Sequence, residues 1–146
     1  MKLIFVLICT LSLIVTTNVY SKEIKSLSQF ENYLVKCLSS FSSKNLCVAT
    51  IIKDHLPAGN DSVKPVADQV EKIFVQWLAK ERVANVYPVQ RKELGGFMIL
   101  QNYIVEDSTA STLLFEITYR KVLGSWQVLK FNINSKSEYI SRKLGY

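Results

Sequence analysis

The sequence predicts an α+β protein in which N-terminal helices pack on a four-stranded antiparallel meander. Two stretches in the first half, about 27–41 and 62–82, carry apolar residues at the three-and-four spacing of one helical face. From Asn85 onward apolar and polar residues alternate, which is the period of a strand. Because the helices come first and the strands follow, we expect the two sets to form two layers around one core.

The first of the helices is predicted from about Leu27 to Phe41, with Ser28 and Glu31 at the spacing of a capping box. Residues 46–56 that follow are ambiguous. Their β-branched residues favour a strand, whereas their place between two helices favours a short second helix. We favour the helix.

The helix predicted over residues 62–82 is the clearest element. Asp61 or Ser62 can cap it, and Pro65 falls in its first turn, where a missing N–H group costs nothing. Its apolar stripe is expected to press against the sheet. The stripe consists of Val66, Val70, Ile73, Phe74, Trp77 and Leu78.

The meander begins with two segments, 85–94 and 97–106, on either side of Gly95-Gly96, which can take the positive φ angles of a tight hairpin. Pro88 cannot donate to a strand ladder, so the first segment is predicted to be an edge strand. The second segment is apolar on both faces and is predicted to be central. Residues 135–146 are left as a polar tail with one helical turn.

The register of the last hairpin depends on its loop. A two-residue loop at Leu123-Gly124 would set Ile117 opposite Lys130, which suits no apolar face. A three-residue loop that ends on Gly124 in a left-handed conformation removes this conflict, and we predict that loop. The resulting pairs are Ile117–Leu129, Phe115–Phe131 and Leu113–Ile133 on the apolar face, and Glu116–Lys130 and Arg120–Trp126 on the other.

The N-terminal 21 residues are typical of an export signal. Lys2 supplies a positive charge, residues 3–15 are almost entirely apolar, and Ser21 is a small residue at a possible cleavage point. The apolar run is shorter than the roughly 20 residues that a spanning helix needs. We therefore predict a signal peptide at 1–21, one α+β domain at 22–146 and a periplasmic or secreted location. The alternative is that the run stays attached as a membrane anchor.

Export affects whether the cysteines form a disulfide and which partners the net charge can attract. Cys37 and Cys47 remain after cleavage, and in an oxidising compartment they are predicted to form a disulfide worth about 2–3 kcal/mol. Two buried free thiols are the alternative. The chain has a net charge of +6, but its basic residues are scattered in pairs, which argues against nucleic acid binding. Attraction to an acidic partner stays open.

The last hairpin runs from Tyr119 through Gly124 and Trp126 to Phe131. Helices followed by a long meander that ends in such a hairpin resemble the nuclear transport factor 2-like and cystatin-like folds, over about residues 62–133. The resemblance implies a cone-like sheet whose open end can hold a small molecule. Such folds host enzymes, binding domains and scaffolds.

Side chains with polar tips on apolar walls would suit a small amphipathic ligand at the mouth of such a cone. The alternative is that these residues simply complete the core. The candidate ligand-binding residues are Trp77, Gln101, Tyr103, Phe115, Tyr119 and Gln127.

The sequence offers few candidate residues for catalysis or for binding a metal or cofactor. His55 is the only histidine, and we interpret it as a surface or helix-end residue rather than a catalytic one. No motif for a metal, a cofactor, a phosphate or a nucleophile elbow is present. The glutamine-led loop of cystatin inhibitors is also missing, since the first hairpin reads Glu93-Leu-Gly-Gly-Phe97.

We therefore predict an exported, non-catalytic envelope domain that binds a protein partner or a small apolar ligand. The first alternative is a membrane-anchored scaffold that resembles the periplasmic domains of secretion-system components. The second is a small isomerase- or lyase-like enzyme that uses the cone.

Overall fold

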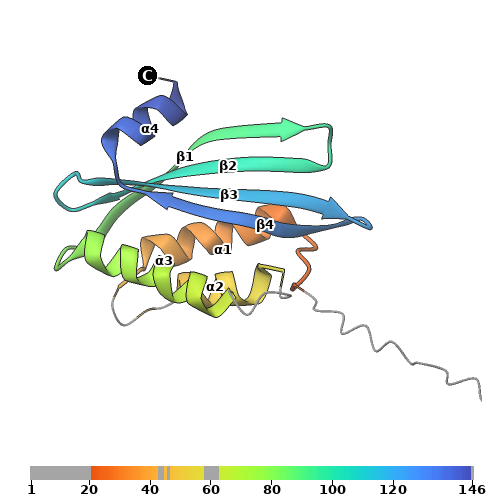
Figure 1. Ribbon diagram of the computed structural model, residues 1–146, viewed down its shortest axis with the longest axis horizontal. Coiled ribbons are helices and arrows are strands. Elements are labelled where there is room, and N and C mark those ends of the chain that lie inside the picture. The colour runs from red at the N-terminus through yellow and green to blue at the C-terminus, as the bar shows by residue number, and fades with distance from the viewer. Residues whose placement is uncertain (1–20, 43–44, 46, 58–62, 146) are drawn as a thin grey trace, which may run out of the picture.

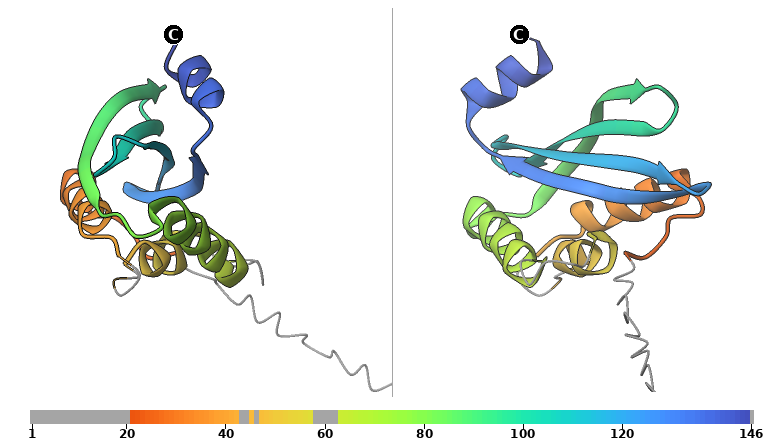
Figure 2. Two further views of the ribbon diagram at one scale, coloured as in Figure 1. Left: turned by 90° about the vertical axis from the view of Figure 1, so that its left-hand side faces the viewer. Right: turned by 45° about the vertical axis from the view of Figure 1, so that its right-hand side comes forward.

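The computed structural model describes residues 21–42, 45, 47–57 and 63–145, and it confirms the α+β class. Three helices, α1 (Leu27–Ser39), α2 (Cys47–His55) and α3 (Val63–Leu78), precede the sheet. The strands β1 (Val83–Leu94), β2 (Met98–Asp107), β3 (Thr112–Val122) and β4 (Ser125–Asn134) pair antiparallel in chain order, and α4 (Ser137–Leu144) follows them. Figures 1 and 2 show α1, α2 and α3 on one side of the sheet and α4 on the other. We call these sides the inner face and the outer face.

The helices form largely where their apolar stripes predict, but with a different cap. The N-cap of α1 is Ser26, whose Oγ accepts a hydrogen bond from the Gln29 N–H at 3.4 Å. The predicted cap, Ser28, is therefore wrong and lies inside the helix. Ser26 caps the helix through this bond, whereas Glu31 of the predicted capping box pairs with Arg91 at 2.8 Å. The predicted caps of α3, Asp61 and Ser62, lie outside the described residues.

Residues 47–55 are helical, as we favoured, and a disulfide joins this helix to the one before it. The Sγ atoms of Cys37 and Cys47 lie 2.02 Å apart and their Cα atoms 5.8 Å apart, within the usual range of a disulfide. The bridge links the last turn of α1 to the first residue of α2. The predicted disulfide is confirmed.

The main core lies between the three helices and the inner face. Alternate residues of β2 and β3 point into it, and Phe74 of α3 meets Phe115 of β3 with ring centroids 6.3 Å apart. On the other side of the core, Phe30 of α1 packs edge-on to Tyr119 at 6.0 Å. The α3 stripe thus presses against the sheet as predicted.

The first hairpin agrees with its prediction. Gly95 and Gly96 both have positive φ, 56° and 69°, and β1 is an edge strand paired only with β2. The register shifts by one residue next to Pro88, where the ladder lacks a donor. β2 lies between β1 and β3, as its two apolar faces predict.

The predicted register of the last hairpin is wrong. The turn has two residues, Leu123 and Gly124, with φ of 49° and 88°, and Val122 pairs directly with Ser125. Positive φ at both central residues is what a type I′ turn requires, and it matches the twist of the strands. Only the left-handed conformation of Gly124 agrees with the prediction.

The conflict between apolar and polar residues is resolved by a β-bulge instead of by the loop. Tyr119 pairs with Val128 whereas Thr118 pairs with Lys130, so Leu129 is the extra residue of β4. Beyond the bulge Ile117 faces Phe131, and the apolar residues return to the inner face.

The bulge overturns several predicted neighbours. Leu129 is 38% exposed and is not part of the apolar wall. Gln127 lies opposite Arg120 and so belongs to the outer face. The cation over Trp126 is Lys121, whose Nζ lies 5.7 Å from the ring centroid, instead of Arg120.

The C-terminal segment is an eight-residue helix, α4, instead of a polar tail with a single turn. Ile140 of this helix and Leu114 of β3 are both buried, yet neither belongs to the main core. They are buried apolar residues of α4 and of the strand that α4 approaches.

The chain entering α1 is tied to the domain at two places. The Lys22 N–H donates to the Asp54 carbonyl at 2.8 Å, and the Lys22 carbonyl lies 3.0 Å from Nδ1 of His55. Two residues later, Ile24 forms an isolated antiparallel bridge with Trp126 of β4. Ser21, at the start of this segment, is 5% exposed.

Candidate functional site

The outer face is a set of four rows that run across the strands. In each row, one residue from each strand is paired with its neighbours in the ladder. The first row is Leu94, Met98, Arg120 and Gln127; the second is Lys92, Leu100, Thr118 and Lys130; the third is Gln90, Asn102, Glu116 and Asn132; the fourth is Tyr87, Ile104, Leu114 and Asn134.

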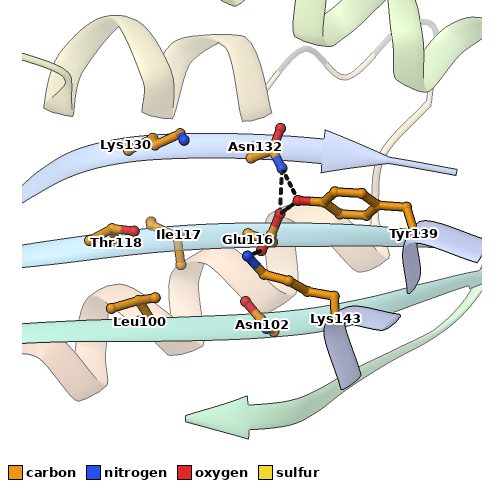
Figure 3. A pocket seen from close by; sticks show the side chains of 9 residues that line it. All are labelled: Leu100, Asn102, Glu116, Ile117, Thr118, Lys130, Asn132, Tyr139 and Lys143. Atoms are coloured by element: carbon orange, nitrogen blue, oxygen red, sulfur yellow. Dashed lines mark hydrogen bonds and ion pairs between the residues drawn. The ribbon is translucent and has the colours of Figure 1, made fainter. Parts of the chain in front are cut away.

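The third and fourth rows carry α4. Ile140 of the helix and Leu114 of the fourth row are both buried, and Glu116 of the third row receives donors from the helix. The Tyr139 hydroxyl donates to the Glu116 carboxylate at 2.8 Å, and the Lys143 ammonium lies 3.0 Å from it. Figure 3 shows these donors converging on the carboxylate from α4. They hold the helix on the sheet.

Glu116 receives a further hydrogen bond from the side-chain amide of Asn132, its partner on β4. The side chain is 12% exposed. Burial alone would raise the pKa of this carboxyl, but the donors from Asn132, Lys143 and Tyr139 outweigh it and lower the pKa. Glu116 is therefore held ionised with three donors around it. That arrangement suits a structural ion pair and is a poor starting point for acid–base chemistry.

A hollow of about 120 Å³ lies on the outer face beside α4. It is lined by residues of the second and third rows, among them Leu100, Thr118 and Lys130, and by Tyr139 and Lys143 of the helix (Figure 3). Since a water molecule occupies about 30 Å³ of the liquid, the hollow has room for roughly four waters or one side chain.

The first and second rows lie clear of the polar contacts that hold α4. They contain three cations, Lys92, Arg120 and Lys130, which are exposed and whose side chains form no ion pair or hydrogen bond within the described part of the chain. Neither row contains an acidic residue. Between the cations lie the partly exposed apolar side chains of Met98 and Leu100. This half of the outer face is thus an apolar strip with unpaired positive charge around it.

Four of the six predicted ligand-binding residues come together, but within the core. Tyr103, Phe115 and Tyr119 are at most 2% exposed. Buried Gln101 donates to the backbone carbonyls of Gln90 and Asn102. These side chains fill the inner face, which corresponds to the alternative in which they complete the core.

The other two predicted residues lie apart from that group. Trp77 sits on α3, where its indole N–H donates to Oγ of Ser111 at 3.1 Å. Gln127 is on the outer face, in the first row. The structure therefore does not gather the six residues around one opening.

The two core tyrosines carry hydroxyls that are far from water. Burial raises the pKa of both Tyr103 and Tyr119, and the negative charge of nearby Glu31 adds to the effect. The two phenols influence each other's pKa, but the Tyr119 hydroxyl has no partner in hydrogen-bond geometry within the described residues. Both phenols stay protonated at neutral pH and can only donate or accept hydrogen bonds.

His55 is buried at the end of α2. Its ring packs edge-on against Phe30 at 4.8 Å, and its Nδ1 is engaged with the Lys22 carbonyl. Burial lowers the pKa of the imidazole, which is therefore neutral at neutral pH. These contacts give the histidine a structural place at a helix end. Within the described residues, no group of three or more His, Cys, Asp or Glu side chains could hold a metal ion.

Comparison of the chain with known protein families, with curated proteins and with solved structures finds no match. The resemblance to nuclear transport factor 2-like and cystatin-like folds therefore stays a prediction. Of the helices in the described residues, none is long and apolar enough to cross a membrane.

Sequence reasoning missed the outer face as a candidate site, although one signal was present. Met98, Leu100 and Ile104 alternate with the inward residues of β2, so the strand is apolar on both sides. An apolar outer face requires a cover. One part of that cover is α4, and the first two rows remain open.

Proposed function

We propose that this protein is an exported, non-catalytic domain that binds a protein partner through the first and second rows of its outer face. The observation that carries the proposal is the apolar strip of Met98 and Leu100, flanked by unpaired cations. An apolar patch rimmed by polar groups is typical of an interaction surface. A small apolar ligand in the cone has less support, because the side chains of the inner face fill the space it would need.

Export to the periplasm or beyond the cell is part of the proposal. The Cys37–Cys47 disulfide supports it, since such bonds persist in oxidising compartments. The intact mass of the protein isolated from the envelope or the medium tests it. Loss of residues 1–21 is the expected result, whereas a mass that retains them would favour the membrane-anchored scaffold.

An enzymatic role has less support, because neither Glu116 nor His55 is in a state that suits acid–base chemistry. Glu116 is held ionised by three donors, and His55 is packed against Phe30. We expect His55→Ala to lower stability without changing partner binding. Loss of biological activity in this variant at unchanged stability would overturn the non-enzymatic proposal.

Photo-cross-linking in living cells tests the binding surface directly. A photoreactive residue at Met98 should give a discrete cross-linked product with one protein. The same residue at Tyr33, which is exposed on α1, is the matched control and should not give that product. Met98→Asp should abolish the interaction while the melting temperature stays close to that of the wild type. An identical pattern from Met98 and Tyr33, or no product from Met98, would contradict the proposed surface.

A further inference from the structure

The outer face already shows how it receives a helix. Ile140 of α4 is buried, and Tyr139 and Lys143 of the same helix bind Glu116 of the third row. The helix thus combines one buried apolar side chain with polar groups that match the charge of the row beneath. A lysine ammonium and a tyrosine hydroxyl on the helix bind a carboxylate on the sheet.

The first and second rows continue this surface with the opposite charge. Their middle is apolar, at Met98 and Leu100, and their charged residues are all cations: Lys92, Arg120 and Lys130. Because strands lie about 4.8 Å apart, a row across four strands spans roughly 14 Å. That span corresponds to between two and three turns of an α-helix. Two adjacent rows lie about 7 Å apart, so a helix 10–12 Å wide would cover both.

We propose that the first and second rows bind an amphipathic helix of a partner protein that carries acidic residues on both sides of its apolar stripe. The helix would lie beside α4, with its apolar stripe over Met98 and Leu100. Its acidic residues would face Arg120 on the side of the first row and Lys92 and Lys130 on the side of the second. This inference rests on the proposed function and specifies the class of partner.

The hollow beside α4 adds a place for one anchoring side chain. Thr118 and Lys130 of the second row line it, and its volume of about 120 Å³ is close to that of one side chain. An acidic side chain that enters it would meet the unpaired Lys130 ammonium. The Glu116 carboxylate nearby is already neutralised by Lys143, so it does not oppose such a side chain strongly.

Two other occupants fit the surface less well. A flat anionic membrane would be held off, because α4 stands above the same face directly beside these rows (Figures 1 and 2). A second copy of this chain would bring its own excess of positive charge, since the sequence has 18 basic against 12 acidic residues. The experiment distinguishes both a membrane and a second copy from the acidic helix.

The test uses the protein without residues 1–21, two designed helical peptides and vesicles of anionic phospholipid. The peptides share one apolar stripe and differ only in their flanks, which carry glutamates in one and lysines in the other. Binding is followed by two-dimensional NMR, which also detects weak complexes, and by anisotropy of a labelled peptide. We expect the acidic peptide to bind roughly ten-fold more tightly than the basic one, more weakly at high salt, and to shift the amide signals of Leu100 and Thr118.

Charge reversal supplies the decisive control. The double variant Lys92→Glu/Lys130→Glu should bind the acidic peptide roughly ten-fold more weakly than the wild type does. It should bind the basic peptide more tightly than the wild type does. The matched variant Lys72→Glu/Lys80→Glu makes the same change in net charge at exposed positions outside the sheet and should bind as the wild type does. Equal loss in both variants would mean that net charge alone attracts the peptide, and the inference would fail.

The remaining outcomes separate this inference from the proposed function. If Met98 cross-links a natural partner but neither peptide binds on these rows, the proposed binding surface is kept. The proposal that the partner supplies an acidic helix is then wrong. Binding to vesicles that the Lys92/Lys130 variant abolishes, without peptide binding, would replace the helix with a membrane. A concentration-dependent dimer that Met98→Asp disrupts would replace it with a second copy.

Discussion

The two faces of the sheet differ in what holds their covers in place. On the inner face, three helices cover large apolar side chains such as Phe115, and a disulfide ties two of those helices together. On the outer face a single short helix has one buried apolar side chain, Ile140, and is joined to the sheet by the ion pair of Glu116 with Lys143. The inner face thus supplies the stability of the fold. The outer face leaves two of its four rows without a covering helix, and this is possible because it contributes little to the core.

The largest effect should come from the inner face. Phe115→Ala removes a ring that meets Phe74, Tyr103 and Phe131, and we expect it to lower the free energy of unfolding by about 3–5 kcal/mol. Met98→Ala on the open part of the outer face should cost below about 1 kcal/mol. Denaturant titration of both variants measures the contrast. Similar losses in the two would show that the faces share the work of stabilisation.

Removing the disulfide should have the next largest effect. The bond closes a loop between residues 37 and 47, and on the chain-entropy model its loss costs about 3 kcal/mol. Chemical unfolding of Cys37→Ser/Cys47→Ser against the wild type measures this loss. Two reactive thiols per chain in the unfolded, unreduced protein would rule the bridge out.

The sequence predicted the parts of the fold that depend on local pattern. Apolar stripes placed the helices, and the paired glycines at 95–96 placed the first hairpin. The last hairpin failed because a bulge at Leu129 leaves no signal of its own: any residue can be the extra one, and only packing against the inner face selects it. The prediction lengthened the loop so that apolar residues would face apolar residues. In the structure the bulge in β4 achieves the same pairing.

The candidate site was predicted less well than the fold. The alternation correctly turned Tyr103, Phe115 and Tyr119 inward, but it could not tell a lined cavity from a filled core, which depends on side-chain volumes in three dimensions. The helix α4 was missed because eight residues form no stable helix by themselves. Its contacts with Glu116 stabilise it, and Glu116 is far from it in sequence.

The attachment of α4 can be weakened without touching the inner face. Glu116→Gln replaces the charged acceptor of three donors, and we expect a loss of about 1–2 kcal/mol, visible as faster amide exchange in α4. The matched control Glu138→Gln changes an exposed carboxyl on α4 and should leave this exchange unaltered.

The same contact should depend on pH. The pKa of Glu116 is lower in the folded protein than in the unfolded chain. Its contribution is therefore present above the unfolded pKa and is lost as the pH falls through the folded pKa. The stability difference between wild type and Glu116→Gln should shrink in acid, and a difference that is constant with pH would contradict the charged contact. His55, whose pKa is also lowered, cancels in this difference because both proteins contain it.

The smallest effect should come from Leu123 in the turn between β3 and β4, and a substitution of its neighbour Gly124 should act in the opposite direction. Leu123 has a positive φ of 49° and a fully exposed side chain, so Leu123→Asn should stabilise the protein by about 0.5–1 kcal/mol. Gly124→Val at φ 88° should instead cost about 1–2 kcal/mol. Thermal denaturation of both variants checks the signs. Destabilisation by Leu123→Asn would count against the two-residue turn.

The segment before α1 is bonded to the folded domain, and this determines whether removal of a leader must precede folding. Ser21 is buried, and Lys22 is bonded through its N–H to Asp54 at the end of α2. A processing peptidase must draw an extended chain into its cleft, and the folded domain withdraws this stretch from reach. If the leader is removed after Ser21, the cut has to come before the segment closes onto α2 and β4. Removal of the leader then competes in time with folding, and a chain that folds too soon keeps its leader.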